Sequence, residues 1–233
     1  MKTYLEPGDI SKLENATTNM RDRLLVRVLF HLGIRVTEAI SLTVDDIDLI
    51  HGRVTIQHLK MRIRATCSHC GSRLAKVHVY CPGCGSEVGT VVTKAMEQRK
   101  IRTLPIDEET LEMIEHFISK GGPVYKDGKQ MLFGINRHRA WQIIRNCATD
   151  AGLGELVSPE TGRRRGVSPH RLRDAFAVNA VKHDDSGDGL RMLQEHLGHQ
   201  SFNTTARYRK IADDEHRQWY DKVWDKGEEE LGG

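Results

Sequence analysis

The sequence predicts a mainly helical α+β protein with a small antiparallel sheet. Apolar residues recur at helical spacing in several segments, and the alternation typical of strands is strongest between residues 53 and 106. No apolar run approaches the ~18–20 residues that a membrane span needs, and the N-terminus has no apolar signal core. With 38% hydrophobic and 29% charged residues among 233, the composition is typical of a folded, soluble protein. We therefore expect a cytoplasmic protein with no membrane partner.

The first helices are expected on both sides of a tight corner. Leucine and valine residues recur every four positions over 21–32 and predict an amphipathic helix, which Gly33 can end. A short second helix can start after Thr37, and this places Arg35 in the corner between the two.

Capping residues locate the later helices. Asp107 can cap a helix that follows the strands, and Ser168 before Pro169 is typical of a helix N-terminus. A polar loop is expected over 158–168. The remaining predicted elements are strands at 53–59, 88–93 and 100–106 and helices at about 136–151, 188–197, 201–211 and 213–225.

Four of the five cysteines form the pattern C-x2-C-x10-C-x2-C. A glycine follows each pair and allows the backbone to turn its amides toward sulfur. Four thiolates suit tetrahedral Zn²⁺, and a site closed by four protein ligands is structural rather than catalytic. Two disulfides are the alternative, which an intracellular chain disfavours. The predicted zinc ligands are Cys67, Cys70, Cys81 and Cys84.

The zinc ribbon is short, about 65–86, and strand-like residues flank it on both sides. We therefore expect it to be inserted at the tip of a β-hairpin instead of following in series. Because four sulfurs complete the metal shell, His69 and His78 are interpreted as surface residues. Cys147 falls on an apolar helix face and is expected to be a buried core thiol.

Three further segments carry residue types that bind phosphate. Arg35 lies in GIRVTEAISL, and His199 follows Gly198 in a segment that reaches Tyr208 nine residues later. His170 and Arg173, in SPHRLRDAFAVNAV, are three residues apart and share a face near a helix N-terminus. That terminus adds free N–H groups and a partial positive charge.

Each of these residues also has a plainer explanation. Arg35 could simply pair with Glu38, and His199 could be a helix C-cap. Tyr208 near a helix end could be a core residue with a solvated hydroxyl.

Taken together, these segments resemble the tyrosine recombinase (lambda-integrase-like) family in order and spacing. The resemblance covers most of the chain, from about Tyr4 to Tyr220, apart from the zinc insertion. The matching motifs are the arginine box around Arg35, the H-x-x-R box His170-Arg171-Leu172-Arg173, the L-G-H box Leu197-Gly198-His199, and the T-T-x-x-Y ending with Thr204, Thr205 and Tyr208.

The resemblance implies a recombinase catalytic domain over 1–225 that cleaves and rejoins DNA through a 3′-phosphotyrosyl intermediate, without ATP or a catalytic metal. It implies that Tyr208 is the nucleophile and that Arg35 and Arg173 hold the developing phosphate charge. It also implies that His170 is a general base and that His199 hydrogen-bonds the phosphate.

The family's catalytic lysine is harder to assign. The zinc insertion disrupts a simple alignment, so Lys60, Lys94 and Lys100 compete. Lys60 is favoured, followed by Lys94, because it ends the strand GRVTIQHLK at a family-like interval from Arg35. The zinc ribbon could serve only to stabilise its hairpin. It could also contact DNA, since basic residues over 60–64 lead into it, and the two alternatives stay open.

Two other functions stay open: a type IB topoisomerase-like nicking-closing enzyme, and a catalytically silent zinc-ribbon DNA-binding accessory protein. The resemblance implies double-stranded DNA as partner and a DNA-bound tetramer linked through the helix near 213–225, which could instead pack on its own core. Only about 20 residues precede the first catalytic helix, where family members usually carry a DNA-clamping domain. A short zinc-bearing integrase hints at an archaeal or viral source.

The net charge of +3 conceals an uneven distribution. Residues 213–233 hold eight acids and three bases, a net of −5, so the rest of the chain carries +8. The segment 161–173 alone has five arginines and no acid. We expect a basic body that binds phosphates and a flexible acidic tail over 226–233.

Overall fold

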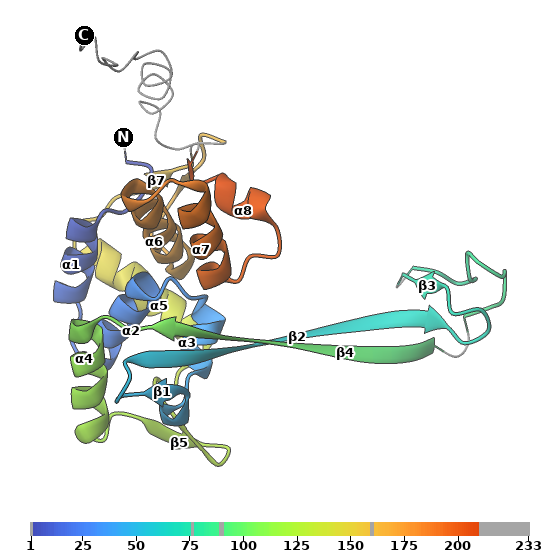
Figure 1. Ribbon diagram of the computed structural model, residues 1–233, viewed down its shortest axis with the longest axis horizontal. Helices are drawn as coiled ribbons and strands as arrows, with labels where there is room; N and C mark the ends of the chain where they lie inside the picture. The colour runs from blue at the N-terminus through green and yellow to red at the C-terminus, as the bar shows by residue number, and fades with distance from the viewer. Residues whose placement is uncertain (1, 76, 89–90, 159–160, 210–233) are drawn as a thin grey trace, which may run out of the picture. The chain divides into compact units, whose positions relative to one another are not determined.

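The computed structural model describes residues 2–75, 77–88, 91–158 and 161–209, and for 58–64 and 91–100 it describes the backbone alone (Figure 1). The chain divides into two compact units. The first comprises Met1–Val54 and Leu104–Gly233, and the second comprises Thr55–Thr103. The predicted zinc ribbon lies within the second unit.

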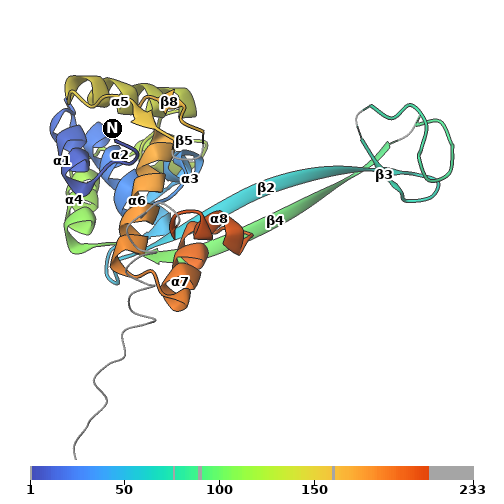
Figure 2. The same ribbon diagram turned by 90° about the horizontal axis from the view of Figure 1, so that it is seen from above.

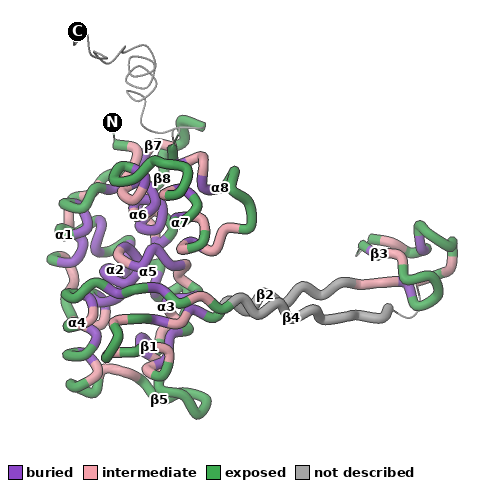
Figure 3. Tube along the Cα trace, in the orientation of Figure 1, coloured by how far each residue is buried: buried purple, intermediate pink, exposed green. Residues whose placement is uncertain are grey.

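The first unit is a helical bundle around α2, which packs against α1, α3, α4, α5 and α6. Leucines and valines along α2 are fully buried, and Figure 3 shows the buried residues gathered on α2, α5 and α6. Among the described helices, none is long and apolar enough to cross a bilayer. The helices are α1 Pro7–Asn15, α2 Met20–His31, α3 Val36–Ser41, the 3-10 helix η1 Val44–Asp46, α4 Glu108–Ser119, α5 Arg137–Asp150, α6 Pro169–His183, α7 Gly187–Leu197 and α8 Phe202–Ala206.

Short strands connect these helices. β5 (Val124–Lys126) and β6 (Lys129–Met131) form a hairpin, whose turn residues Asp127 and Gly128 have φ of 51° and 74°. Two positive φ values in a two-residue loop match the twist of a tight hairpin and explain the Asp-Gly sequence. The other strand pairs of this unit are β1 (Ile47–Asp48) with the start of β2, and β7 (Leu156–Val157) with β8 (Arg164–Arg165).

The second unit is formed by two long paired strands and the cysteine loops between them. β2 (Arg53–Cys67) pairs with β4 (Val91–Pro105) and, near its end, antiparallel with β3 (Arg73–Leu74). Figure 2 shows β2 and β4 side by side from a second direction. Two of the cysteines and Leu74 form a small core of their own.

The predicted fold class is confirmed, while some element boundaries differ. The strands expected at 88–93 and 100–106 are one strand, β4, because pairing with β2 carries the backbone through the charged residues that interrupt the alternation. The helix expected over 201–211 is shorter, since α8 ends at Ala206. The helix expected near 213–225 and the tail 226–233 lie outside the described residues.

Candidate active site

Arg173 joins segments that are far apart in the sequence. It lies in the first turns of α6 and is only 2% exposed. Its guanidinium donates to the carbonyl of Gly33 at 2.8 Å and to the carbonyl of Leu197 at 2.7 Å. It also lies 3.2 Å from Nε2 of His199. One buried arginine therefore connects the arginine box, the H-x-x-R box and the L-G-H box.

Arg35 reaches the same region through a shared acid. It is the N-cap of α3, and its guanidinium pairs with Oε1 of Glu38 at 3.0 Å. The other carboxylate oxygen of Glu38 lies 3.9 Å from Arg173 and accepts the backbone N–H of Arg35 at 2.9 Å. The pairing with Glu38 that the sequence suggested is therefore present, and Glu38 stands between two arginines that could bind one phosphate.

His199 is fixed by contacts on both ring nitrogens. The turn that precedes it is made by Gly198, whose φ of 64° lies in the left-handed region that favours glycine. Because Arg173 can only donate, Nε2 of His199 must accept. Nδ1 then carries the proton and donates to the hydroxyl of the buried Thr205 at 2.9 Å.

Tyr208 is buried, with 3% of its surface exposed. Its ring is nearly parallel to that of His199, at an interplanar angle of 17° and a centroid distance of 6.4 Å. The hydroxyl donates to Oδ1 of Asp174 at 2.9 Å and accepts from Arg207 at 3.1 Å. Burial, followed by the negative charge of Asp174, raises the pKa of Tyr208 to about 12.

His170 lies one turn before Asp174 on α6, with its Nε2 3.8 Å from Oδ1 of that residue. Its side chain is largely exposed at the edge of the site. Desolvation by neighbouring atoms lowers the pKa of His170 below its ordinary value; the charge of Asp174 opposes this shift, and the charges of Arg173 and Arg207 add to it. A neutral imidazole can accept a proton, which a general base requires.

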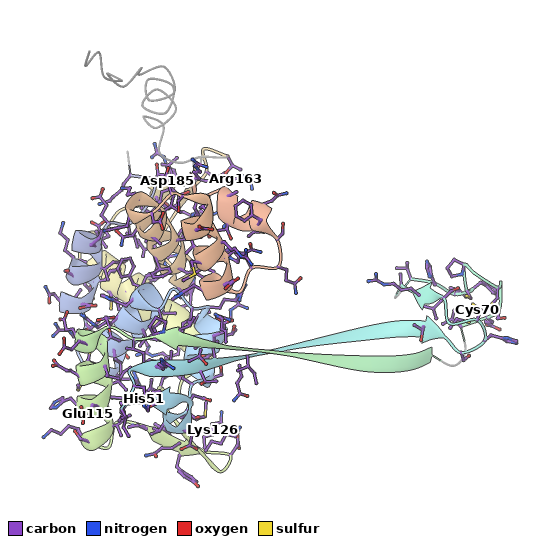
Figure 4. All side chains as sticks on the ribbon, viewed as in Figure 1. His51, Cys70, Glu115, Lys126, Arg163 and Asp185 are labelled. Atoms are coloured by element: carbon purple, nitrogen blue, oxygen red, sulfur yellow. The ribbon has the colours of Figure 1, made fainter. Side chains whose placement is uncertain are left out.

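A pocket of about 700 Å³ opens beside Tyr208. His170, Asp174 and Tyr208 are on its wall, and most of its charged lining is basic. Figure 4 labels the exposed Arg163, which directly precedes the lining residue Arg164 in the chain. The arginines that line the pocket are Arg145, Arg164, Arg165, Arg171 and Arg207.

The predicted residues thus fall into two contact networks. Arg35, Arg173 and His199 belong to one, and His170 and Tyr208 to the other; the parallel rings of His199 and Tyr208 are where the two networks meet.

The sequence did not single out Asp174 or Arg207. Both are adjacent to a motif residue, Arg173 or Tyr208, and that adjacency is the signal that could have found them. The side chains of Lys60 and Lys94 lie outside the described part of the structure.

The four cysteines of the second unit converge. Their sulfurs all lie within 4.8 Å of one another, with 3.7 Å between Cys67 and Cys84 and 3.4 Å between Cys70 and Cys81. Zn–S bonds of about 2.3 Å give tetrahedral edges of about 3.8 Å, whereas a disulfide is about 2.05 Å long. The donor set therefore fits a tetrahedral metal ion and not two disulfides.

The backbone of this cluster repeats in both knuckles. The N–H of His69 points at Cys67 at 3.4 Å and that of Gly83 at Cys81 at 3.3 Å. Such amides stabilise metal-bound thiolates. Hydrogen bonds from Ser72 lower the pKa of Cys70 to about 6, so one thiolate is available near neutral pH.

The phage integrase family model matches residues 4–79 and 83–215. The chain belongs to the phage integrase family. The predicted resemblance to tyrosine recombinases is thereby confirmed, and the matched residues include every motif that carried it.

Bacterial relatives of this integrase-family chain support the same conclusion. It is 27% identical over 201 residues to the tyrosine recombinase XerD of Neisseria meningitidis serogroup B, covering 83% of this chain and 51% of that protein. It is 29% identical over 192 residues to the tyrosine recombinase XerC of Roseiflexus sp., covering 82% of this chain and 48% of that protein. The chain spans about half the length of these curated relatives, and they give no support to the expected archaeal or viral source.

Solved structures of integrase-family proteins share the fold. The crystal structure of XerA recombinase matches with a TM-score of 0.63 at 21% identity, covering 96% of this chain and 64% of that one. The XerH site-specific recombinase bound to its palindromic difH substrate matches with a TM-score of 0.60 at 18% identity, covering 94% of this chain and 52% of that one. The catalytic domain of bacteriophage HP1 integrase matches with a TM-score of 0.52 at 20% identity, covering 97% of this chain and 96% of that one.

Proposed function

We propose that this integrase-family chain carries the catalytic domain of a site-specific DNA recombinase that cleaves and rejoins double-stranded DNA through a 3′-phosphotyrosyl intermediate. The observation that carries the proposal is the convergence on Arg173. This residue contacts Gly33, Leu197 and His199, which come from two other motifs. These contacts hold Arg173 beside His199, and Glu38 links it to Arg35. Cationic and hydrogen-bonding groups fixed around one point can stabilise the charge that develops on a phosphate in the transition state.

In the proposed reaction, the Tyr208 oxygen attacks the scissile phosphorus while the bond to the 5′-oxygen breaks. The tyrosine proton passes to neutral His170, and the leaving 5′-oxygen takes a proton from Lys60, with Lys94 as the alternative donor. Arg35 and Arg173 hold the non-bridging oxygens, for which a planar guanidinium is well suited. The phosphotyrosyl bond replaces a phosphodiester bond, so rejoining to a 5′-hydroxyl reverses the step.

DNA as the partner is supported by relatives and by charge. The XerH structure holds a difH substrate, and the pocket beside Tyr208 is lined by five arginines. Phosphate contacts by these groups would make binding weaken steeply with salt. Assembly of four copies through the segment 213–225 is proposed as well.

The bound metal is proposed to be one structural Zn²⁺ held by the four cysteines. Sulfur-only ligation selects zinc over magnesium or calcium, and a filled shell keeps no open position for substrate. We assign the metal to the fold of the second unit and not to the reaction.

The test is a DNA duplex with a nick beside the cleavage site, so that the short 5′-product diffuses away and the adduct accumulates. The wild-type protein should form a covalent adduct that survives denaturation, and Tyr208→Phe should form none. Tyr125→Phe, an exposed hydroxyl on β5, is the matched control and should react normally. Absence of any adduct on DNA that the protein binds would favour the silent accessory protein. Relaxation of supercoils without exchange between two sites would favour the topoisomerase-like enzyme.

A further inference from the structure

We propose that Asp174 is an internal anion that holds Tyr208 in a resting position until a DNA phosphate takes its place. The inference rests on the proposed function, because it concerns the same nucleophile. It adds a positioning residue that belongs to none of the motif positions of this chain.

The contact between the two residues is buried. Asp174 and Tyr208 are each 3% exposed, and the hydroxyl donates to Oδ1 of the carboxylate at 2.9 Å. The oxygen also accepts an N–H of Arg207 at 3.1 Å, which occupies one of its lone pairs. The two bonds hold the phenol oxygen beside a carboxylate whose negative charge opposes the approach of a phosphate.

Asp174 also gathers the nitrogen donors that surround it. Its carboxylate lies 3.4 Å from Arg171, 3.5 Å from Arg207 and 3.8 Å from Nε2 of His170. Two guanidinium groups, one imidazole and one tyrosine hydroxyl around a carboxylate form a set of donors that a phosphate would also accept. All of these side chains line the same 700 Å³ pocket, so an incoming phosphate can compete for them.

The charges favour a restraining role over that of a proton acceptor. A carboxylate is a much weaker base than a tyrosinate, with ordinary pKa values of about 3.9 and about 10, so the shared proton stays on Tyr208. The negative charge of Asp174 would repel a phosphate placed beside it. Removing that charge should therefore release the nucleophile and ease entry of the phosphate.

The experiment measures single-turnover adduct formation on the nicked duplex for Asp174→Asn. Loss of a charge-assisted hydrogen bond predicts a rise of about fivefold or more in the rate, together with more adduct on duplexes of unrelated sequence. Asp188→Asn, an exposed acid in the first turn of α7, is the matched control and should match wild type. An unchanged or slower rate for Asp174→Asn overturns the proposal.

A second readout separates this proposal from the proposed function. Ultraviolet titration, taken as the difference from Tyr208→Phe, reports ionisation of Tyr208 without any DNA. Asp174→Asn should lower its pKa relative to Asp188→Asn, and equal values contradict the restraint. If wild-type protein forms no adduct at all, the proposed function fails while this titration still decides the role of Asp174.

Wild-type protein provides the test if Asp174→Asn does not fold. Acetylation of tyrosine hydroxyls by N-acetylimidazole should spare Tyr208 in the free protein and modify it once duplex DNA is bound. Tyr80 and Tyr125, 62% and 77% exposed, report the reagent's activity. Acetylation of Tyr208 in the free protein as fast as Tyr80 contradicts the restraint.

Discussion

Replacement of Arg173 by methionine should destabilise the first unit more than the same replacement of Arg171, the other arginine of α6. The side chain is 2% exposed and donates to two backbone carbonyls, at 2.8 and 2.7 Å. Methionine fills a similar length but donates nothing. The carbonyls of Gly33 and Leu197 would lose their partner in a buried position.

The magnitude follows from these contacts. Hydrogen bonds from a charged donor contribute about 1.5–3 kcal/mol each, and removing one partner of a buried ionic cluster costs about 3–5 kcal/mol. Glu38 keeps its 3.0 Å pair with Arg35 but loses the second cation at 3.9 Å. We expect Arg173→Met to reduce the free energy of unfolding by about 3–5 kcal/mol, a large part of a typical domain's stability.

Urea unfolding followed by far-ultraviolet circular dichroism, at constant zinc, measures this loss. Arg171→Met is the control, because Arg171 is on the same helix and its guanidinium pairs with Asp174 at 3.4 Å. It should cost about 1–2 kcal/mol, because one charge-assisted contact is lost and Asp174 keeps its pair with Arg207 at 3.5 Å. Equal, small losses for both variants would refute the view that Arg173 holds the motifs together.

Three further predictions concern other parts of the molecule. Gly33→Ala should lower the free energy of unfolding by about 1–3 kcal/mol in thermal unfolding, because Gly33 has φ +56° and an added Cβ would lie 2.3 Å from the Phe176 ring. The control Gly162→Ala, at φ +64° with open space around it, should cost only about 1 kcal/mol. Equal losses would contradict the steric argument. Chelation of zinc should make the second unit sensitive to protease while the first stays protected, with metal analysis giving about one zinc per chain beforehand; the same digestion pattern with and without chelator would contradict a structural metal. The pKa of Tyr208 is raised from 10.0 to about 12, so its contribution to stability is present below pH 10 and is lost as the pH rises through 12. Over that range the free energy of unfolding of the wild type should fall by about 2–3 kcal/mol more than that of Tyr208→Phe. Parallel stability curves would show that Tyr208 ionises as easily in the folded protein as in the unfolded one.

Helix caps, tight turns and the buried faces of helices could be predicted from the sequence, because they depend on residues close together in the chain. Asp107 accepts the N–H of Thr110 at 3.0 Å, as expected for the cap of α4. The glycines after each cysteine pair adopt φ of 73° and 70°, which lets the two knuckles turn. Cys147 is buried, as the apolar face predicted.

Contacts that span the chain could not be predicted in the same way. The sequence indicated Arg173 as a phosphate ligand. Its hydrogen-bond partners Gly33 and Leu197 lie 140 and 24 residues away in the chain, so these contacts could not be predicted from local patterns. Ser168 lies at the predicted N-cap of α6, yet its side chain makes no capping bond. Asp174 forms its network only once α6 and the segment after α8 lie together, so its role depends on tertiary structure.

The central claim is that Tyr208 becomes covalently linked to DNA, and mass spectrometry of the isolated adduct tests it most directly. Digestion of the adduct with protease and nuclease should leave one nucleotide attached through its 3′-phosphate to the peptide that contains Tyr208. The released strand should carry a 5′-hydroxyl that polynucleotide kinase can label. A nucleotide on any other residue, or a 5′-phosphate on the tyrosine, would contradict the account.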